Sequence, residues 1–284
     1  MKSRILVACI VAGLPFAAQA QQADGDWQDA LSRLGVAGTF AELGYSGTDE
    51  SSTIPFADSS RQLQWRVGAI ARYLDSRLVV TPSLTLRHQW GSGANRFADI
   101  DTSGTIAGAG LSLAYAPTHN LRFQVGGTVS GGEQEAVFNG ADSSLTGLFS
   151  ASAHAGVGID IYRDLRSRIT ISNQLAYHYS HADYAPTNSV DESHSRLVSN
   201  TLSLSGTYQV NADTSLNASV GLVSLLKAEV MSGEDPLDTS YGLVSVGASH
   251  ELADGFTLYG NIGTTIANQN STDLNGKLGL RIMF

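Results

Sequence analysis

The sequence predicts an all-β protein: a twelve-stranded antiparallel up-and-down transmembrane β-barrel with a short N-terminal helix. Three observations favour this class. Segments that alternate apolar and polar residues recur along the chain, the connections between them alternate in length, and the chain carries few charges. Charged residues make up 15% of the 284 residues, against about 25% in ordinary soluble domains. A barrel wall that is apolar outside and polar inside explains such a composition without any long apolar run.

The first twenty residues have the pattern of a secretory signal peptide. Lys2 and Arg4 precede an apolar run that ends in the small-x-small site Ala18-Gln19-Ala20. The run is too short for a membrane-spanning helix and ends where a peptidase would cut. Cys9 is the only cysteine, so a chain cleaved after residue 20 has no disulfide. Sheet closure or packing must hold it together.

Residues 21–35 form the segment between the signal peptide and the barrel. Asp26 can cap a short helix that places Trp27, Leu31 and Leu34 on one side. Such a helix would sit in the lumen or at the mouth of the barrel. A disordered leader is the alternative.

Residues 36–284 form the predicted barrel, because twelve segments in this range have the period-two pattern of strands. An even number of strands is what bacterial single-chain barrels require. The predicted strands lie near residues 36–47, 61–73, 77–90, 103–116, 120–131, 144–162, 167–181, 195–210, 214–230, 240–252, 255–267 and 273–284.

The connections between these strands alternate between short and long. The short ones are rich in turn-forming residues, for example Leu74-Asp75-Ser76, Asn211-Ala212-Asp213 and Ala253-Asp254. The long ones are polar loops near residues 48–60, 91–102, 132–143, 182–194, 231–239 and 268–272. Short turns at one end and long loops at the other match the periplasmic and extracellular ends of a membrane barrel. A soluble β-sandwich has no need of this regularity.

The two faces of the strands differ in the expected way. In the strand near 201–210, Leu202 and Leu204 share the outward face, while Thr201 and Ser203 share the inward face. Aromatic residues collect at two levels, as the headgroup regions of a bilayer favour. The predicted periplasmic girdle holds Tyr73, Tyr115, Phe123, Tyr208, Phe256 and Phe284, and the predicted outer girdle holds Trp65, Trp90, Phe149, Tyr177, Tyr179 and Tyr241.

The last strand carries a further signal. Leu278, Leu280, Ile282 and the terminal Phe284 lie on one face of it. This resembles the closing strand of Gram-negative outer-membrane barrels, whose assembly machinery reads a C-terminal Phe preceded by alternating apolar residues. The resemblance implies residence in the outer membrane after export to the periplasm. It also implies the barrel-assembly machinery, outer-membrane lipid and lipopolysaccharide as partners.

Two families of such barrels share features with the chain. The layout of signal peptide, short helix, twelve strands and terminal Phe resembles autotransporter translocator domains, as does the closing stretch 255–284. Pairs of strands around a tight Asp turn resemble small outer-membrane transporters that take up aromatic compounds. Neither resemblance rests on a motif that assigns a role to a residue.

The inward face is expected to carry charge around a water-filled lumen, because most other inward positions are small and twelve strands leave space between them. The predicted pore-lining residues near the periplasmic end are Arg72, Arg122, Arg168, Arg281 and Asp160, and those higher in the lumen are Arg66, Arg87, Lys227 and Lys277. A charged ring selects permeants by sign, so the basic set would favour anionic or polar solutes. The alternative is that Arg–Asp pairs stiffen the wall while acidic loops repel neighbours or bind them through divalent cations.

An enzyme is the rival class. His178 and Ser180 share one face of a strand, with His181, Asp183 and Asn188 close behind. A hydroxyl nucleophile needs an adjacent imidazole with an orienting partner. Alternation places His178 and Ser180 in the lumen, away from lipid substrate, so no catalysis is expected.

Other function classes lack a signal. His88, His154, His194 and His250 have no metal-ligand spacing, and no glycine-rich phosphate loop points to a cofactor. The net charge of −9 argues against nucleic-acid binding. We therefore expect a channel for passive diffusion or uptake of small solutes. The alternatives are an autotransporter-like or structural barrel that displays acidic loops and, less favoured, an outer-membrane lipid hydrolase.

Overall fold

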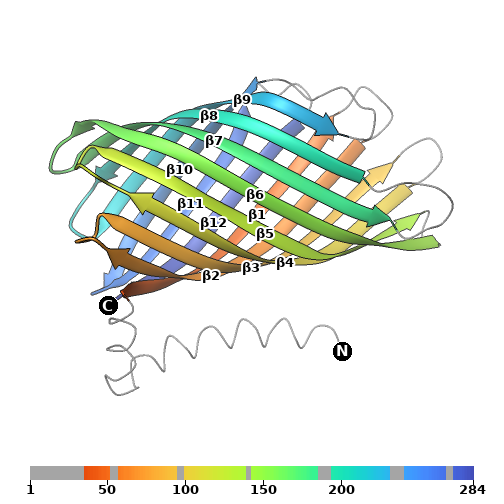
Figure 1. The fold of residues 1–284 in the computed structure, drawn as a ribbon, viewed down its shortest axis with the longest axis horizontal. Coiled ribbons are helices and arrows are strands. Elements are labelled where there is room, and N and C mark those ends of the chain that lie inside the picture. Colours follow the sequence, from red (N-terminus) through yellow and green to blue (C-terminus); the bar gives the residue numbers. More distant parts are fainter. Residues whose placement is uncertain are drawn as a thin grey trace, which may run out of the picture.

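The fold is a single closed sheet of twelve strands, seen in a computed structural model that describes residues 35–51, 57–94, 99–138, 142–184, 193–230, 240–266 and 271–284 (Figure 1). The predicted signal peptide and N-terminal helix lie outside the described residues. The strands are β1 Val36–Ser51, β2 Ala57–Tyr73, β3 Leu78–Ala94, β4 Asp99–Tyr115, β5 Leu121–Phe138, β6 Asp142–Arg163, β7 Ser167–Tyr184, β8 Ser193–Gln209, β9 Thr214–Val230, β10 Ser240–Ala253, β11 Phe256–Ile266 and β12 Ser271–Met283.

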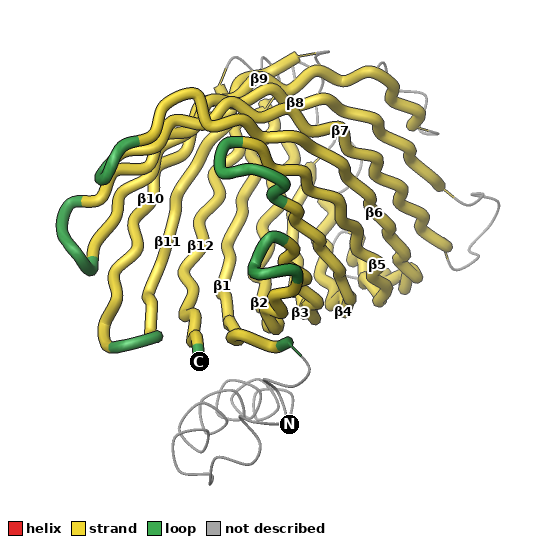
Figure 2. The backbone as a smooth tube through the Cα atoms, turned by 60° about the vertical axis from the view of Figure 1, so that its left-hand side comes forward, coloured by secondary structure: helices red, strands yellow, loops and turns green. Residues whose placement is uncertain are grey.

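Each strand pairs with its neighbour in sequence, and β1 pairs antiparallel with β12 to close the barrel (Figure 2). The closing pair runs from Gly38 opposite Met283 to Glu50 opposite Ser271. Closure leaves no unpaired sheet edge. A sheet that spans a lipid bilayer needs this, because no water is there to hydrogen-bond free backbone groups. The predicted up-and-down barrel of twelve strands is confirmed. No helix within the described ranges is long and apolar enough to cross a membrane.

The predicted strand ends agree within one residue at the tight turns but fall short at most of the loop ends. β1 continues to Ser51 and β5 to Phe138, several residues beyond the predicted limits of 47 and 131. The backbone pairing continues there, whereas the apolar alternation that marks a lipid-facing strand is lost from the sequence before the strand ends.

The turns at the opposite end are tight and locally capped. Leu74, Asp75 and Ser76 all have positive φ, at 53°, 53° and 68°, a conformation that costs L-residues energy. In the turn after β6, Asp164 accepts hydrogen bonds from the Tyr162 hydroxyl at 2.8 Å and the Arg166 amide at 2.7 Å. These donors lower the pKa of the Asp164 carboxyl, the Tyr162 hydroxyl contributing most.

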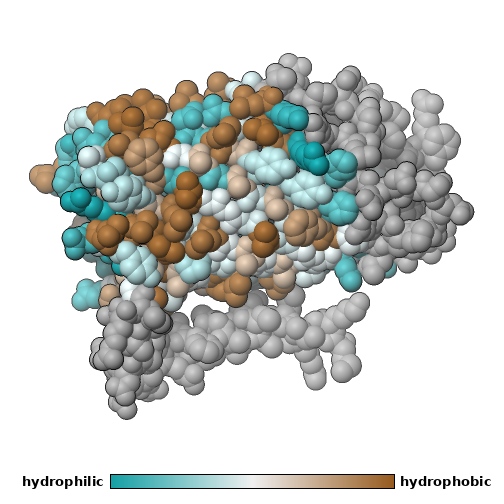
Figure 3. All heavy atoms as spheres, in the orientation of Figure 1, coloured by the Kyte–Doolittle hydropathy of each residue, from teal (hydrophilic) through white to brown (hydrophobic). Residues whose placement is uncertain are grey.

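The barrel has no dry core. Among the described residues no side chain is less than 2% exposed. Leu202 and Leu204 are 50% and 43% exposed on the outer face, and apolar side chains spread over that face in Figure 3. On the inner face, Thr128 and Asn261 are also exposed, in the middle of their strands. Two stacked sheets would bury one of these faces, so the arrangement is that of a tube with an oily exterior and a wet interior.

A few apolar side chains do fill the inner wall. Phe40, Ile106 and Val223 are at most 9% exposed and face inward. Gly68 lies opposite Phe40, and a Cβ there would come within 2.5 Å of the Phe40 ring. Tyr241 pairs with Val223, so it also faces the lumen, and its predicted place in the outer girdle is wrong.

Candidate functional site

The inner wall is lined by pairs of hydroxyl side chains on neighbouring strands. Their oxygens lie 2.6 to 2.8 Å apart, so each pair satisfies part of its own hydrogen bonding across the sheet. These side chains are short, so each reaches only a small distance inward from the wall. The pairs are Thr128–Ser152, Ser130–Ser150, Ser172–Ser203, Ser180–Ser195, Ser215–Ser249 and Ser219–Ser245.

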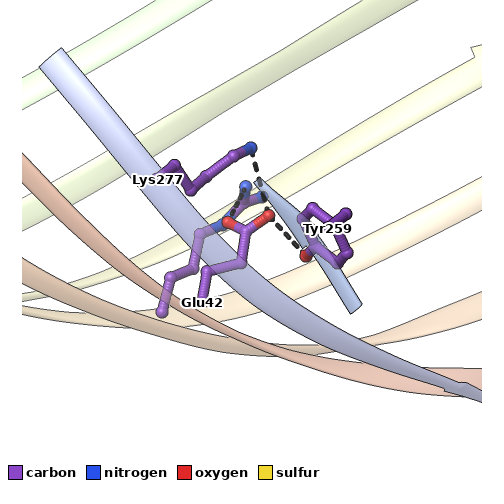
Figure 4. Close-up of polar contacts among 4 residues, drawn as sticks. Glu42, Tyr259 and Lys277 are labelled. Carbon is purple, nitrogen blue, oxygen red and sulfur yellow. Dashed lines mark hydrogen bonds and ion pairs between the residues drawn. The ribbon is translucent and has the colours of Figure 1, made fainter. Parts of the chain in front are cut away.

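A charged cluster crosses the seam where β1 meets β12 (Figure 4). Its centre is Glu42 on β1, whose carboxylate is held by three donors from three other strands. Arg66 Nη1 of β2 lies 3.4 Å from Glu42 Oε2. Lys277 Nζ of β12 lies 3.2 Å from Oε1, and the Tyr259 hydroxyl of β11 donates to the same oxygen at 2.7 Å. We call these four residues the seam cluster.

The seam cluster buries its acid and exposes its bases. The Glu42 side chain is 10% exposed, whereas those of Arg66 and Lys277 are 32% and 40% exposed. Lys277 also lies over the Tyr259 ring, 5.8 Å from its centroid. One buried carboxylate beneath two accessible cations presents a net positive surface to the lumen.

A glycine on β12 makes this arrangement possible. Gly279 is the β12 partner of both Glu42 and Tyr259. A Cβ at Gly279 would come within 2.5 Å of the Tyr259 ring, so only glycine lets the ring lean across β12 and reach Glu42 on the far side.

The predicted pore-lining residues near the periplasmic end occupy inward positions of their strands. Asp160 is 9% exposed and accepts a 2.7 Å hydrogen bond from the Thr170 hydroxyl. Arg122 pairs with Gly158, and Arg281 pairs with Phe40; both arginines are exposed. Arg72 and Arg168 lie on the same inward face of β2 and β7, opposite Val79 and Thr207 respectively.

Arg87 lies higher on the inner wall, opposite Gln64 and Ile106. Its side chain is partly buried, and its Nε is cut off from solvent without a hydrogen-bond partner. An N–H in that state stabilises any acceptor that reaches it.

Lys227 is the exception among the predicted pore-lining residues. A register shift makes Ser199 pair with Leu225 and Val198 pair with Lys227, which leaves Leu226 as an extra residue. Val198 also pairs with the lipid-facing Tyr177, so Lys227 faces outward. The prediction that Lys227 lines the pore assumed strict alternation along β9, and the bulge corrects it.

For the rival enzyme prediction, the hydroxyl of Ser180 is paired with another hydroxyl across the sheet. Ser180 Oγ lies 2.6 Å from Ser195 Oγ on β8. His178 lies on the same inward face and is exposed. Asn188 lies outside the described residues.

Sequence reasoning assigned no site role to Glu42 or Tyr259. A signal for Glu42 existed, because it is a charged residue that shares one face of β1 with the apolar Phe40. Its partners come from β2, β11 and β12, and Tyr259 is 217 positions away, so only the closed barrel brings the cluster together.

Comparison with known proteins gives likeness of fold. No protein-family model and no curated protein matches the chain. The solved transport unit of the Escherichia coli autotransporter AIDA-I superposes with a TM-score of 0.69 at 9% identity, covering 87% of this chain and 90% of that one. The NalP translocator domain of Neisseria meningitidis gives 0.67 at 15% identity, covering 98% and 99%. An outer membrane channel of Pseudomonas putida F1 gives 0.56 at 17% identity, covering 88% and 96%.

Proposed function

We propose that the protein is a passive channel of the Gram-negative outer membrane, through which small polar solutes, anions preferred, cross a water-filled barrel. The observation that carries the proposal is the exposure of side chains on the inner wall, where Thr128, Asn261 and Lys277 are exposed far from either strand end. An eight-stranded barrel fills its interior with side chains, whereas a wider one leaves space for water. The likeness to an outer membrane channel supports the same class.

The preference for anions rests on the charges of the inner wall. Arg122 and Arg281 are exposed inward cations, and the seam cluster adds Arg66 and Lys277 over a buried carboxylate. Of the inward acids at this end, Asp160 is 9% exposed and bonded to a hydroxyl, and Glu251 accepts a hydrogen bond from the Gly255 amide at 3.2 Å. Solutes in the lumen therefore meet mainly positive charge, which lowers the free energy of an anion there.

The test is single-channel recording of the refolded chain in planar bilayers under a potassium chloride gradient. We expect steady openings and a reversal potential displaced towards that of chloride. The double variant Arg122→Gln/Arg168→Gln should move the reversal potential towards zero. The matched control Arg77→Gln/Arg166→Gln loses the same charge from exposed turn residues and should leave it unchanged.

Two results would contradict the proposal. Absence of steady openings would favour a translocator-like or structural barrel that displays its loops. Steady but cation-selective openings would support a channel but contradict the proposed anion preference of the basic inner wall.

The absence of catalysis is part of the proposal. It is supported by the hydrogen bond between Ser180 and Ser195 and by the inward position of His178, away from lipid. Release of fatty acid from phospholipid or lipid A vesicles that is abolished by His178→Ala would overturn it.

A further inference from the structure

The pairing of the strands gives the tilt and the width of the barrel. A row of paired inward residues starts at Arg168 on β7 and runs once around the barrel, through β8 to β12 and then β1 to β6. It returns to β7 at Ala182, fourteen residues further along the strand. At about 3.3 Å per residue and about 4.8 Å between strands, this stagger corresponds to a tilt of about 40° and a backbone radius of about 12 Å. Inward residues that lie at one height can therefore be identified from the register.

Arg87 and His178 lie at the same height in the lumen. The row of paired residues that starts at Arg87 reaches β7 at Ala182, after a climb of about 12 Å over four strands. His178 is four residues before Ala182, which places it about 10 Å lower on a strand with this tilt. The charge of Arg87 also acts on the His178 imidazole. The two side chains therefore extend towards each other from separate parts of the wall.

Tyr241 and Asp273 lie at this height further around the barrel. In the other direction, the row of paired residues from Arg87 reaches Lys277 on β12 and Gly247 on β10, about 9 Å and 15 Å lower. Asp273 is four residues above Lys277, and Tyr241 is six residues above Gly247, which restores about 10 Å and 15 Å. The charge of Asp273 acts on the Tyr241 hydroxyl, as this placement requires. We use the name lumen ring for Arg87, His178, Tyr241 and Asp273.

Long side chains cover the inner wall at the height of the lumen ring. Ile106 pairs with Arg87 and is 5% exposed, and Val223 pairs with Tyr241 and is 4% exposed. These are the two least exposed apolar side chains among the described residues. Burial of this kind is expected where long neighbouring side chains lie over the wall. A solute that crosses this level comes close to the polar groups of the ring.

The charges of the lumen ring are unequally placed. Arg87 is partly buried, and its Nε has no hydrogen-bond partner. Within the described residues, no carboxylate is paired with its guanidinium. Asp273 lies three strands away from Arg87, on the side of Tyr241. A single oxyanion on a neutral polar body fits this arrangement, because a second negative charge would meet Asp273 and be repelled.

From this geometry we propose that the lumen ring binds small hydroxylated monocarboxylates and makes the channel selective for them. The inference rests on the proposed channel function, because the ring is reached through the lumen. Arg87 holds the carboxylate by paired hydrogen bonds, after a change of rotamer that gives its Nε an acceptor. The His178 imidazole donates a further hydrogen bond to the same group. Tyr241 and Asp273 bind the hydroxyl groups of the solute.

The experiment is a titration of the refolded chain in detergent with gluconate, followed by saturation-transfer NMR of the ligand, which detects binding without a conducting channel. Arg87→Gln should lose at least tenfold in affinity. Arg87→Lys should lose severalfold, since a lysine keeps the charge without the fork. The matched control Arg77→Gln removes the same charge from an exposed turn residue and should stay within twofold of the parent.

Two further solutes test the class of ligand. Glucose has the hydroxyl groups of gluconate without its charge, and glucose 6-phosphate carries a group that is close to dianionic at neutral pH. Each should bind at least tenfold more weakly than gluconate. Folding of each variant is checked by its mobility on gels with and without heating, which does not depend on the solute.

Affinity of Arg87→Gln for gluconate within twofold of the parent would overturn the proposal. Glucose 6-phosphate that binds as tightly as gluconate would also overturn it, because the ring would then accept any oxyanion. Absence of gluconate binding together with steady, anion-selective openings would refute the ring and leave the proposed function standing. Binding of gluconate to a barrel that shows no openings would refute the channel and keep the ring.

Discussion

Replacing Glu42 by Gln tests the seam cluster, because it removes one charge and keeps the shape of the side chain. The carboxylate is 10% exposed and is shared by Arg66, Lys277 and the Tyr259 hydroxyl. The two cations are 32% and 40% exposed, so each ion pair contributes about 0.5 to 1 kcal/mol after screening by water. The hydrogen bond from the Tyr259 hydroxyl loses its charged acceptor, which costs about 1 kcal/mol of stability. We expect the free energy of unfolding to fall by about 2 to 3 kcal/mol.

The assay is urea unfolding of the barrel refolded into liposomes, followed by tryptophan fluorescence. Glu133→Gln is the matched control, because Glu133 is exposed on the outer face, and it should change the free energy by less than about 0.5 kcal/mol. A double-mutant cycle of Glu42→Gln with Tyr259→Phe should give a coupling energy of about 1 kcal/mol. If Glu42→Gln is no worse than the control, the cluster does not hold the seam and the reasoning fails.

Three further changes test other parts of the wall, each by the same unfolding assay. Gly279→Ala places a Cβ 2.5 Å from the Tyr259 ring and should cost about 1 to 3 kcal/mol, whereas Gly206→Ala, with nothing within 4 Å, should cost nothing; equal effects would refute the packing argument. Ser76→Gly relieves a φ of 68° and should stabilise the barrel by about 1 kcal/mol; a loss of stability would show that the serine side chain matters more than the strain. The lowered pKa of Asp164 means that its charge stabilises the fold above the ordinary aspartate pKa, and that this contribution is lost as pH falls through that value towards the folded pKa. The difference between wild type and Asp164→Asn should therefore be present at pH 7 and vanish at the acid end of that window, and a difference that persists unchanged there would contradict the assignment.

The sequence was sufficient for the parts of the fold that depend on period and turn chemistry. Strand ends at the tight turns follow from turn-forming residues such as Asp75 and Asp254, because the short segments around them fit a turn between two strands. The outward and inward sets of β8 follow from its strict alternation between Leu202 and Ser203. The loop ends of β1 and β5 were placed too early, because strands above the membrane have no apolar face to mark them.

The site was less accessible from the sequence. Lys227 was placed in the pore because a one-residue bulge leaves no trace in a period-two pattern, yet it turns every later side chain to the other face. The seam cluster was missed because Glu42, Arg66, Tyr259 and Lys277 meet only when the first and last strands pair. Which distant positions meet depends on the stagger of the closed barrel.

The central claim is that one closed sheet separates lipid from water, and spin labels placed one at a time on residues 201–208 of β8 test it most directly in lipid bilayers. Each label is attached to an introduced cysteine, and Cys9 is the only native cysteine that must be removed first. Collisions with oxygen should peak at Leu202, Leu204, Gly206 and Tyr208, and collisions with a water-soluble nickel complex should peak at the residues between them. Two opposed period-two waves would agree with an oily exterior and a hydrated lumen. A set of leucine positions shielded from both reagents would mean a dry interior between two sheets and would contradict the account.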